Sequence, residues 1–149
     1  MIVKILRRLT NFLDVLGKIG IKKYCMLKRD GVHYSRYQIF NRKWITDLDI
    51  CNVLDIGANV GEFTLIFHHL FDDPIIHSFE PLPSCKAKLD SIVSNRPNIT
   101  FHSYALGARE STEVLHVSSH APSSSILNMG ERHKIDYPHS ADSSDVGIQ

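Results

Sequence analysis

The sequence predicts a mixed α/β fold, a parallel sheet with helices on both of its faces. Two observations indicate this fold. Short apolar runs at 53–56, 75–79 and 99–104 have the length of buried strands, and segments with helical spacing separate them. Strand, helix, strand, helix, strand is the alternation of a parallel sheet with right-handed crossovers. One extra strand is predicted at 112–117, where apolar and polar residues alternate.

Length and composition bound the class of protein. The chain has 149 residues, of which 43% are hydrophobic and 22% charged, so it is long enough to bury one core. Its three cysteines are widely spaced and form no CxxC pair, which argues against a disulfide framework and a zinc site and favours a reducing compartment, the cytoplasm. We find no apolar run of about 18 residues and no cleavage-site pattern, so we expect neither a membrane span nor a signal peptide.

Residues 1–50 are expected to form a basic amphipathic helix and a connector. The first 29 residues contain eight Lys or Arg against Asp14 alone. Apolar residues recur there at helical spacing, and Gly17 and Gly20 follow as breaks. These apolar residues are Ile2, Ile5, Leu6, Leu9, Leu13 and Leu16. Packing on the chain's own domain is the favoured interpretation, and peripheral contact with an anionic membrane is the alternative.

Residues 51–130 contain the elements of the predicted sheet. In the helix after the first strand, apolar residues recur at i, i+3, i+4, i+7 and i+8: Phe63, Ile66, Phe67, Leu70 and Phe71. The next helix repeats that spacing with Cys85, Leu89, Ile92 and Val93, and it ends before Pro97. Residues 131–149 are polar with few apolar anchors, so we expect a poorly ordered tail.

A ligand site is predicted at the turn that follows the first strand. In open parallel sheets, ligands bind outside the carboxyl ends of the strands, and Asp55, Gly57, Asn59 and Gly61 lie at such an end. Gly57 can adopt backbone angles closed to other residues, and Gly61 permits close packing between helix and strand. The amides at the start of the helix are expected to offer donors to a carboxylate or phosphate.

Glu80 is predicted to be the second anchor of the ligand. It ends the second strand about twenty residues after the turn, where an acidic side chain can accept both hydroxyls of a ribose. Pro81 stops that strand. Asn59 occupies the place of the second glycine in a G-x-G-x-x-G fingerprint, which disfavours NAD. Asp55 suits a ligand with a positive amino group, such as S-adenosylmethionine.

Four motifs, in order, resemble those of the FkbM-type S-adenosylmethionine-dependent methyltransferases. They are "VLDIGANVGEFTL", "HSFEPLPSCKAKL", "SYALG" and "SSSIL", within 53–127. The resemblance implies a Rossmann-like class I methyltransferase sheet and S-adenosyl-L-methionine as cofactor. It implies that the methionine portion of the cofactor is held by Asp55, Gly57, Asn59 and Gly61. The ribose would be held by Glu80, and the adenine by Ala105 and Leu106. Ala58 and Pro81 complete the predicted site.

The chain departs from the family in having no later K-I-D-x-E-G-like motif. We therefore expect an incomplete sheet, the first three parallel strands plus an extra strand, from the N-terminal part of a methyltransferase or a truncated gene. The resemblance implies O-methylation of a sugar or glycolipid hydroxyl, with a small molecule or glycan as acceptor and no nucleic acid. The alternatives are a cofactor-binding chain without catalysis and, less favoured, an NAD-dependent oxidoreductase.

No residue is assigned as catalytic base. His77, His102 and Tyr104 lie on predicted strands, where burial or exposure is the commoner explanation. No metal site is predicted, because the adjacent His68 and His69 project about 100 degrees apart on a helix. The serines at 123–125 could line the acceptor side or form a flexible loop.

Overall fold

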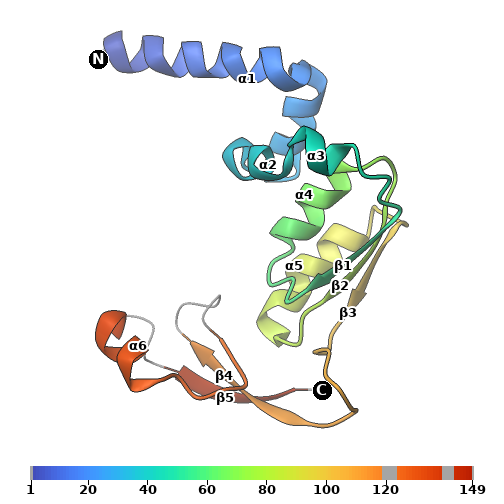
Figure 1. Ribbon diagram of the computed structural model, residues 1–149, viewed down its shortest axis with the longest axis vertical. Coiled ribbons are helices and arrows are strands. Elements are labelled where there is room, and N and C mark those ends of the chain that lie inside the picture. The colour runs from blue at the N-terminus through green and yellow to red at the C-terminus, as the bar shows by residue number, and fades with distance from the viewer. Residues whose placement is uncertain (1, 119–123, 139–142, 149) are drawn as a thin grey trace. The chain divides into compact units, whose positions relative to one another are not determined.

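The computed structural model describes residues 2–118, 124–138 and 143–148 (Figure 1). The chain divides into two compact units. The first consists of Met1–Cys51 and Leu65–Pro74, and the second of Asn52–Thr64 and Ile75–Gln149. The second unit contains both sheets and the predicted ligand site.

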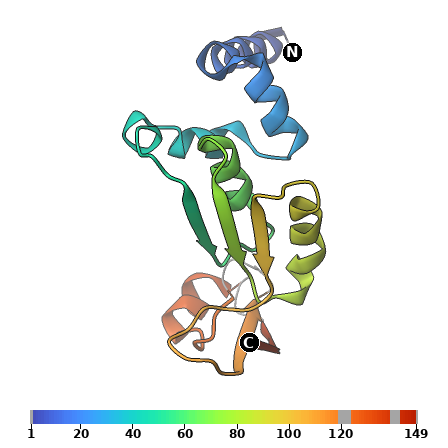
Figure 2. The same ribbon diagram turned by 90° about the vertical axis from the view of Figure 1, so that its right-hand side faces the viewer.

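The larger sheet confirms the mixed α/β class. Its strands are β1 (Asn52–Ile56), β2 (Ile75–Phe79) and β3 (Ile99–His102), parallel and in the order β1-β2-β3. The register pairs Asp55 with Ser78 and Phe79 with His102. All three strands therefore end at one edge, and in Figure 2 their arrowheads point toward the smaller sheet.

The prediction of helices on both faces is wrong for this unit. Strand order proceeds in one direction, so right-handed crossovers place α4 (Glu62–Leu70) and α5 (Pro83–Val93) on the same face of the sheet. On β1 the other face is open, because Leu54 and Ile56 are 62% and 63% exposed. In this sheet β1 is an edge strand.

In place of the poorly ordered tail that we expected, the described part of 131–149 contains α6 (Glu131–Asp136) and β5 (Ser143–Ile148). β5 pairs antiparallel with β4 (Glu113–Ser118), the extra strand predicted from alternation. The physical reason is one apolar cluster, whose buried members are Ala58, Leu82, Cys85, Leu89, Leu115 and Ile148. This cluster holds the smaller sheet against α5 and the glycine turn.

The first unit consists of helices. It contains α1 (Ile2–Arg29), α2 (Tyr34–Phe40), α3 (Lys43–Thr46) and the later turns of α4. The predicted break at Gly20 is confirmed, since its φ of 75° and ψ of 157° are not helical, whereas α1 continues through Gly17. No helix in the described residues has the length and apolar character required to cross a membrane.

Hydrogen bonds between buried polar groups join α4 to α1 and to Asp30, the residue that follows α1, within this unit. His69 Nε2 donates to Asp30 Oδ2 at 2.9 Å, and both side chains are nearly inaccessible. Lys23 Nζ donates to the carbonyl of His69. Burial lowers the pKa of His69 below its usual value of 6.5, against the raising effect of Asp30. His69 is therefore a neutral hydrogen-bond donor at neutral pH, and no metal role is needed to explain it.

This buried histidine predicts acid sensitivity. The unfolded chain takes up the histidine proton at a higher pH than the folded chain, so stability should decrease as pH falls through 6.5. His69→Gln removes this titration and should flatten the decrease in Tm between about pH 7 and about pH 5, measured by circular dichroism. The exposed His33→Gln is the control, and equal pH dependence in all three proteins would contradict the prediction.

Of the two glycines in the turn, Gly61 is expected to lose more stability when it is replaced by alanine. Its φ is +80°, and an added Cβ would lie 2.5 Å from Ile92 Cδ1 and 3.0 Å from Leu89 Cδ2. At Gly57, where φ is +78°, the Cβ would meet nothing within 4 Å. Urea unfolding should show a loss of about 2 to 5 kcal/mol for Gly61→Ala, from strain and overpacking, against about 1 to 2 for Gly57→Ala, from strain alone. Equal losses would mean that α5 does not constrain the turn.

Candidate functional site

The turn between β1 and α4 has an unusual backbone. Gly57, Asn59 and Gly61 all have positive φ, at 78°, 50° and 80°. Glycine adopts this region freely and asparagine tolerates it better than most residues. The amides of Gly57 and Ala58 both donate to the carbonyl of Phe79 at 2.9 Å, which fixes the turn to the end of β2.

Glu80 connects this turn to the next one. Its Oε2 accepts from the amide of Asn59 at 2.8 Å, and its Oε1 accepts from the amide of Leu82 at 2.9 Å. Its own amide donates to the carbonyl of His102 at 3.1 Å, and the residue is only 5% exposed. Sequence reasoning assigned the carboxylate to a ribose and missed these partners. Each oxygen retains a second lone pair with which a ribose hydroxyl could bond.

Asp55 lies beneath the turn in a buried network. Thr64 Oγ1 donates to Asp55 Oδ2 at 2.5 Å and lies 2.8 Å from Ser78 Oγ. A hydroxyl has one proton, so Thr64 accepts from Ser78 and donates to the aspartate. Burial raises the pKa of Asp55, while bonds from the Thr64 hydroxyl and amide lower it. Thr64 and Ser78 were missed from sequence, where only their polarity within apolar runs could have indicated them.

The turn contributes open space rather than amide donors. The amide of Gly61 bonds to the carbonyl of Ala58 at 2.8 Å, so the amides of Gly57, Ala58, Asn59 and Gly61 all have partners inside the chain. These four amides are therefore already bonded, and the expectation that the amides at the start of α4 offer donors to an anion stays a prediction. The open space beside Gly57 agrees with its predicted role. Close packing at Gly61 is observed against Ile92 and Leu89 of α5, whereas the prediction was close packing between helix and strand.

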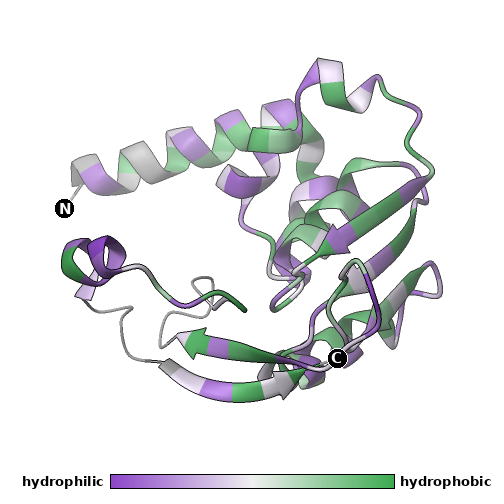
Figure 3. Ribbon diagram, turned by 60° about the horizontal axis from the view of Figure 1, so that its bottom comes forward, coloured by the Kyte–Doolittle hydropathy of each residue, from purple (hydrophilic) through white to green (hydrophobic). Residues whose placement is uncertain are grey.

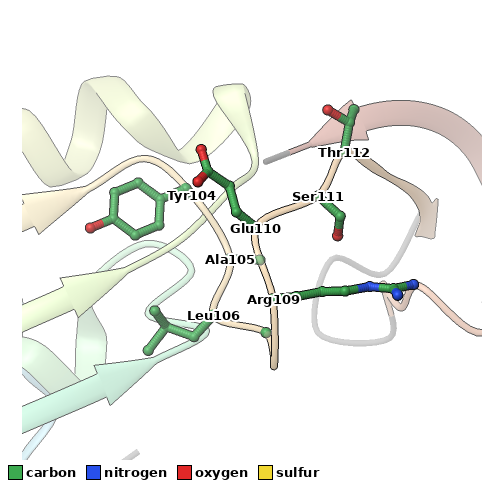
Figure 4. A pocket seen from close by; sticks show the side chains of 8 residues that line it. Tyr104, Ala105, Leu106, Arg109, Glu110, Ser111 and Thr112 are labelled. Atoms are coloured by element: carbon green, nitrogen blue, oxygen red, sulfur yellow. The ribbon is translucent and has the colours of Figure 1, made fainter.

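A cavity of about 470 Å³ lies beyond β3, lined by Tyr104–Gly107 and Arg109–Thr112. Figure 4 shows Tyr104 and Leu106 on one side of this loop and Arg109 extending away on the other. Ala105 lines the cavity and also packs against the apolar cluster that contains Ala58. The structure thus brings the predicted adenine residues together around one cavity, whose lining does not include the glycine turn.

The polar residues on β2 and β3 form a chain on the face opposite Thr64. His77 Nδ1 lies 3.0 Å from His102 Nε2, and His102 Nδ1 lies 3.2 Å from the hydroxyl of Tyr104. Phe79 stacks on His102 with ring centroids 4.5 Å apart. Burial, and secondarily His77, lowers the pKa of His102, which is therefore neutral at pH 7. This row of hydrogen-bonded side chains can pass a proton from one ring to the next, and the hydrogen bonds that join its members include no carboxylate.

The remaining candidates do not extend the site. Ser124 Oγ accepts from the amide of Ser118 at 3.2 Å, and the main chain of Ser125 pairs with His116, so both fasten their loop to β4. Ser123 lies outside the described residues. Within the described residues, no three His, Cys, Asp or Glu side chains are grouped as a metal would require. Pro81 follows the end of β2 at Phe79, as predicted.

Comparison of the chain with models of protein families, with curated proteins and with solved structures finds no match. The assignment of function therefore depends on the residues themselves. Two groups are assembled at the carboxyl edge of the sheet: Asp55 with Thr64 and Ser78, and Asn59 with Glu80.

The raised pKa of Asp55 predicts that this carboxylate destabilises the fold at neutral pH. A folded pKa above the usual 3.8 means that stability is lost as pH rises through the folded value. Asp55→Asn should therefore raise Tm by a few degrees at about pH 7, with a smaller gain at about pH 4. The exposed Asp90→Asn is the control and should show no such gain. A lower Tm for Asp55→Asn at neutral pH would contradict the prediction.

Proposed function

We propose that this chain binds S-adenosyl-L-methionine at the carboxyl edge of its parallel sheet and acts as a methyltransferase on a hydroxyl oxygen. The observation that carries the proposal is the turn at Gly57–Gly61, in which the left-handed Asn59 donates its amide to Glu80 after the end of β2. A sugar or glycolipid acceptor is proposed solely from the resemblance of the motifs to the FkbM-type methyltransferases.

The residues present fit the parts of this cofactor. Open space beside Gly57 would receive the methionine portion, and the ionisable Asp55 beneath the turn would favour its positive amino group. The unused lone pairs of Glu80 would receive ribose hydroxyls. The cavity that Ala105 and Leu106 line would receive the adenine.

The chemistry requires alignment and one proton transfer. When bound, S-adenosylmethionine supplies an electrophilic methyl group for in-line displacement. The chain must then position the acceptor oxygen and accept its proton. His102 is neutral at pH 7 and hydrogen-bonded to Tyr104, so it is the first residue to test as proton acceptor.

A cofactor-binding role without catalysis is the second candidate. The exposed face of β1, with Leu54 and Ile56, favours it, because the site has described strands on only one side of β1. An NAD-dependent oxidoreductase is disfavoured by Asn59, since a side chain stands where a pyrophosphate needs bare backbone.

The compartment is proposed from the cysteines. Cys25 and Cys51 are exposed free thiols, and Cys85 is buried. Exposed thiols persist where the surroundings are reducing. We therefore propose the cytoplasm.

Calorimetry with S-adenosylhomocysteine tests the proposal. The wild-type chain should bind, and Glu80→Gln should bind at least about tenfold more weakly, because one amide oxygen cannot accept from both Asn59 and Leu82. The exposed Glu131→Gln is the matched control and should bind as the wild type does. Circular dichroism of each variant verifies its fold.

Three results would change the conclusion. Absence of binding by folded wild-type chain would exclude the cofactor. Binding without transfer of labelled methyl to any sugar or glycolipid acceptor would favour the non-catalytic candidate. Tighter binding of NADH than of S-adenosylhomocysteine would favour the oxidoreductase.

A further inference from the structure

The first part of α1 presents an exposed apolar stripe. Leu6, Leu9 and Leu13 are 56%, 52% and 57% exposed. Their spacing places them on one face of the helix, and Ile2 and Ile5 continue the same spacing in the sequence. Figure 3 shows hydrophobic and hydrophilic residues alternating along the turns of α1. The favoured interpretation of the sequence, in which this stripe packs on its own domain, is therefore wrong for Leu6, Leu9 and Leu13.

A different side of the helix contacts the rest of its unit. Phe12 meets Tyr24 edge to face, with ring centroids 5.3 Å apart. A cavity of about 940 Å³ is lined by Asn11, Phe12, Asp14 and Val15 together with residues that follow Gly20. The three leucines do not line this cavity. The helix is thus held in its unit through one side, while the leucine stripe is exposed.

Positive charge is concentrated on the same helix. The first 29 residues hold eight Lys or Arg and one acid, whereas the other 120 hold nine Lys or Arg and fifteen Asp or Glu. The single acid, Asp14, is already paired with Lys18 at 2.7 Å. Lys4 and Lys18 project from the side opposite Leu9, at 100 degrees per residue. The helix segment therefore has a formal charge of +7 and the remainder −6.

We propose that the first part of α1, from Ile2 to Ile19, lies in the surface of an anionic lipid bilayer. The leucine stripe enters the boundary of the acyl chains and the basic residues face the phosphate layer. A segment of 18 residues is about 27 Å long, and its stripe runs along the axis as a surface helix requires. No described helix is apolar enough to cross a membrane, so this helix lies on the surface.

Charge selects the bilayer over a second copy of the chain. Pairing two such helices through their leucines would bring together two segments from Ile2 to Ile19, each with a formal charge of +3. An anionic surface instead gains roughly fivefold in affinity for each nearby Lys or Arg. The same surface repels the acidic remainder, which leaves α1 as the contacting element.

Vesicle co-sedimentation with the full chain tests the proposal. At low salt the chain should sediment with vesicles that contain phosphatidylserine and remain in solution with pure phosphatidylcholine. Lys4→Gln combined with Arg8→Gln removes two positive charges from this segment and should weaken binding on the order of twentyfold. Added salt should weaken wild-type binding in the same direction.

A matched pair of variants separates the stripe from the charge. Leu13→Glu and Asn11→Glu add the same charge to the same helix, but only the first places it in the leucine stripe. Leu13→Glu should weaken binding to anionic vesicles at least about tenfold more than Asn11→Glu, because it also removes the apolar contact of Leu13 with the acyl chains. Circular dichroism verifies that both variants keep their helices.

Three outcomes would overturn the proposal. One is the absence of sedimentation with anionic vesicles by folded wild type. Another is equal binding by Leu13→Glu and Asn11→Glu, which would leave only diffuse charge attraction. The third is a dimer in analytical ultracentrifugation that dissociates in the Leu13→Glu variant, which would show that the leucine stripe is the contact between two copies of the chain.

Discussion

The carboxylate of Glu80 is the interaction on which the site depends. It accepts the amide of Asn59 with one oxygen and the amide of Leu82 with the other, so it joins the turn after β1 to the turn after β2. Hydrogen bonds to a buried charge contribute about 1.5 to 3 kcal/mol each, enough to hold Asn59 in its left-handed conformation. Without them the turn would relax, and the open space beside Gly57 would lose its shape.

A second buried carboxylate supports the proposal that this edge binds a ligand. Asp55 is only 8% exposed, and its hydrogen bonds from Thr64 offset only part of the cost of burial. A neutral side chain there would fold more favourably. Carboxylates that cost stability cluster where proteins bind ligands, which supports the assignment of this edge as the functional site.

Sequence patterns predicted the parts of this fold that depend on local spacing. The three parallel strands and the break at Gly20 follow from periodicity or from backbone freedom. Contacts between distant segments were missed. The partners of Glu80 are main-chain amides, which every residue except proline has, so no side-chain pattern indicates them. The strand β5 was missed because Val146 and Ile148 are the only apolar residues that indicate it. Their contribution to stability comes from packing in the cluster around Leu115, which is distant in the sequence.

The two proposals bear on one another through the acceptor. The FkbM-like motifs favour a sugar or glycolipid, whereas the leucine stripe and basic residues of α1 favour a bilayer surface, and these arguments share no residue. A glycolipid headgroup is presented only at a bilayer, and a chain held there would meet it at high local concentration. Together, the two proposals favour the membrane-borne acceptor among those that the motifs allow.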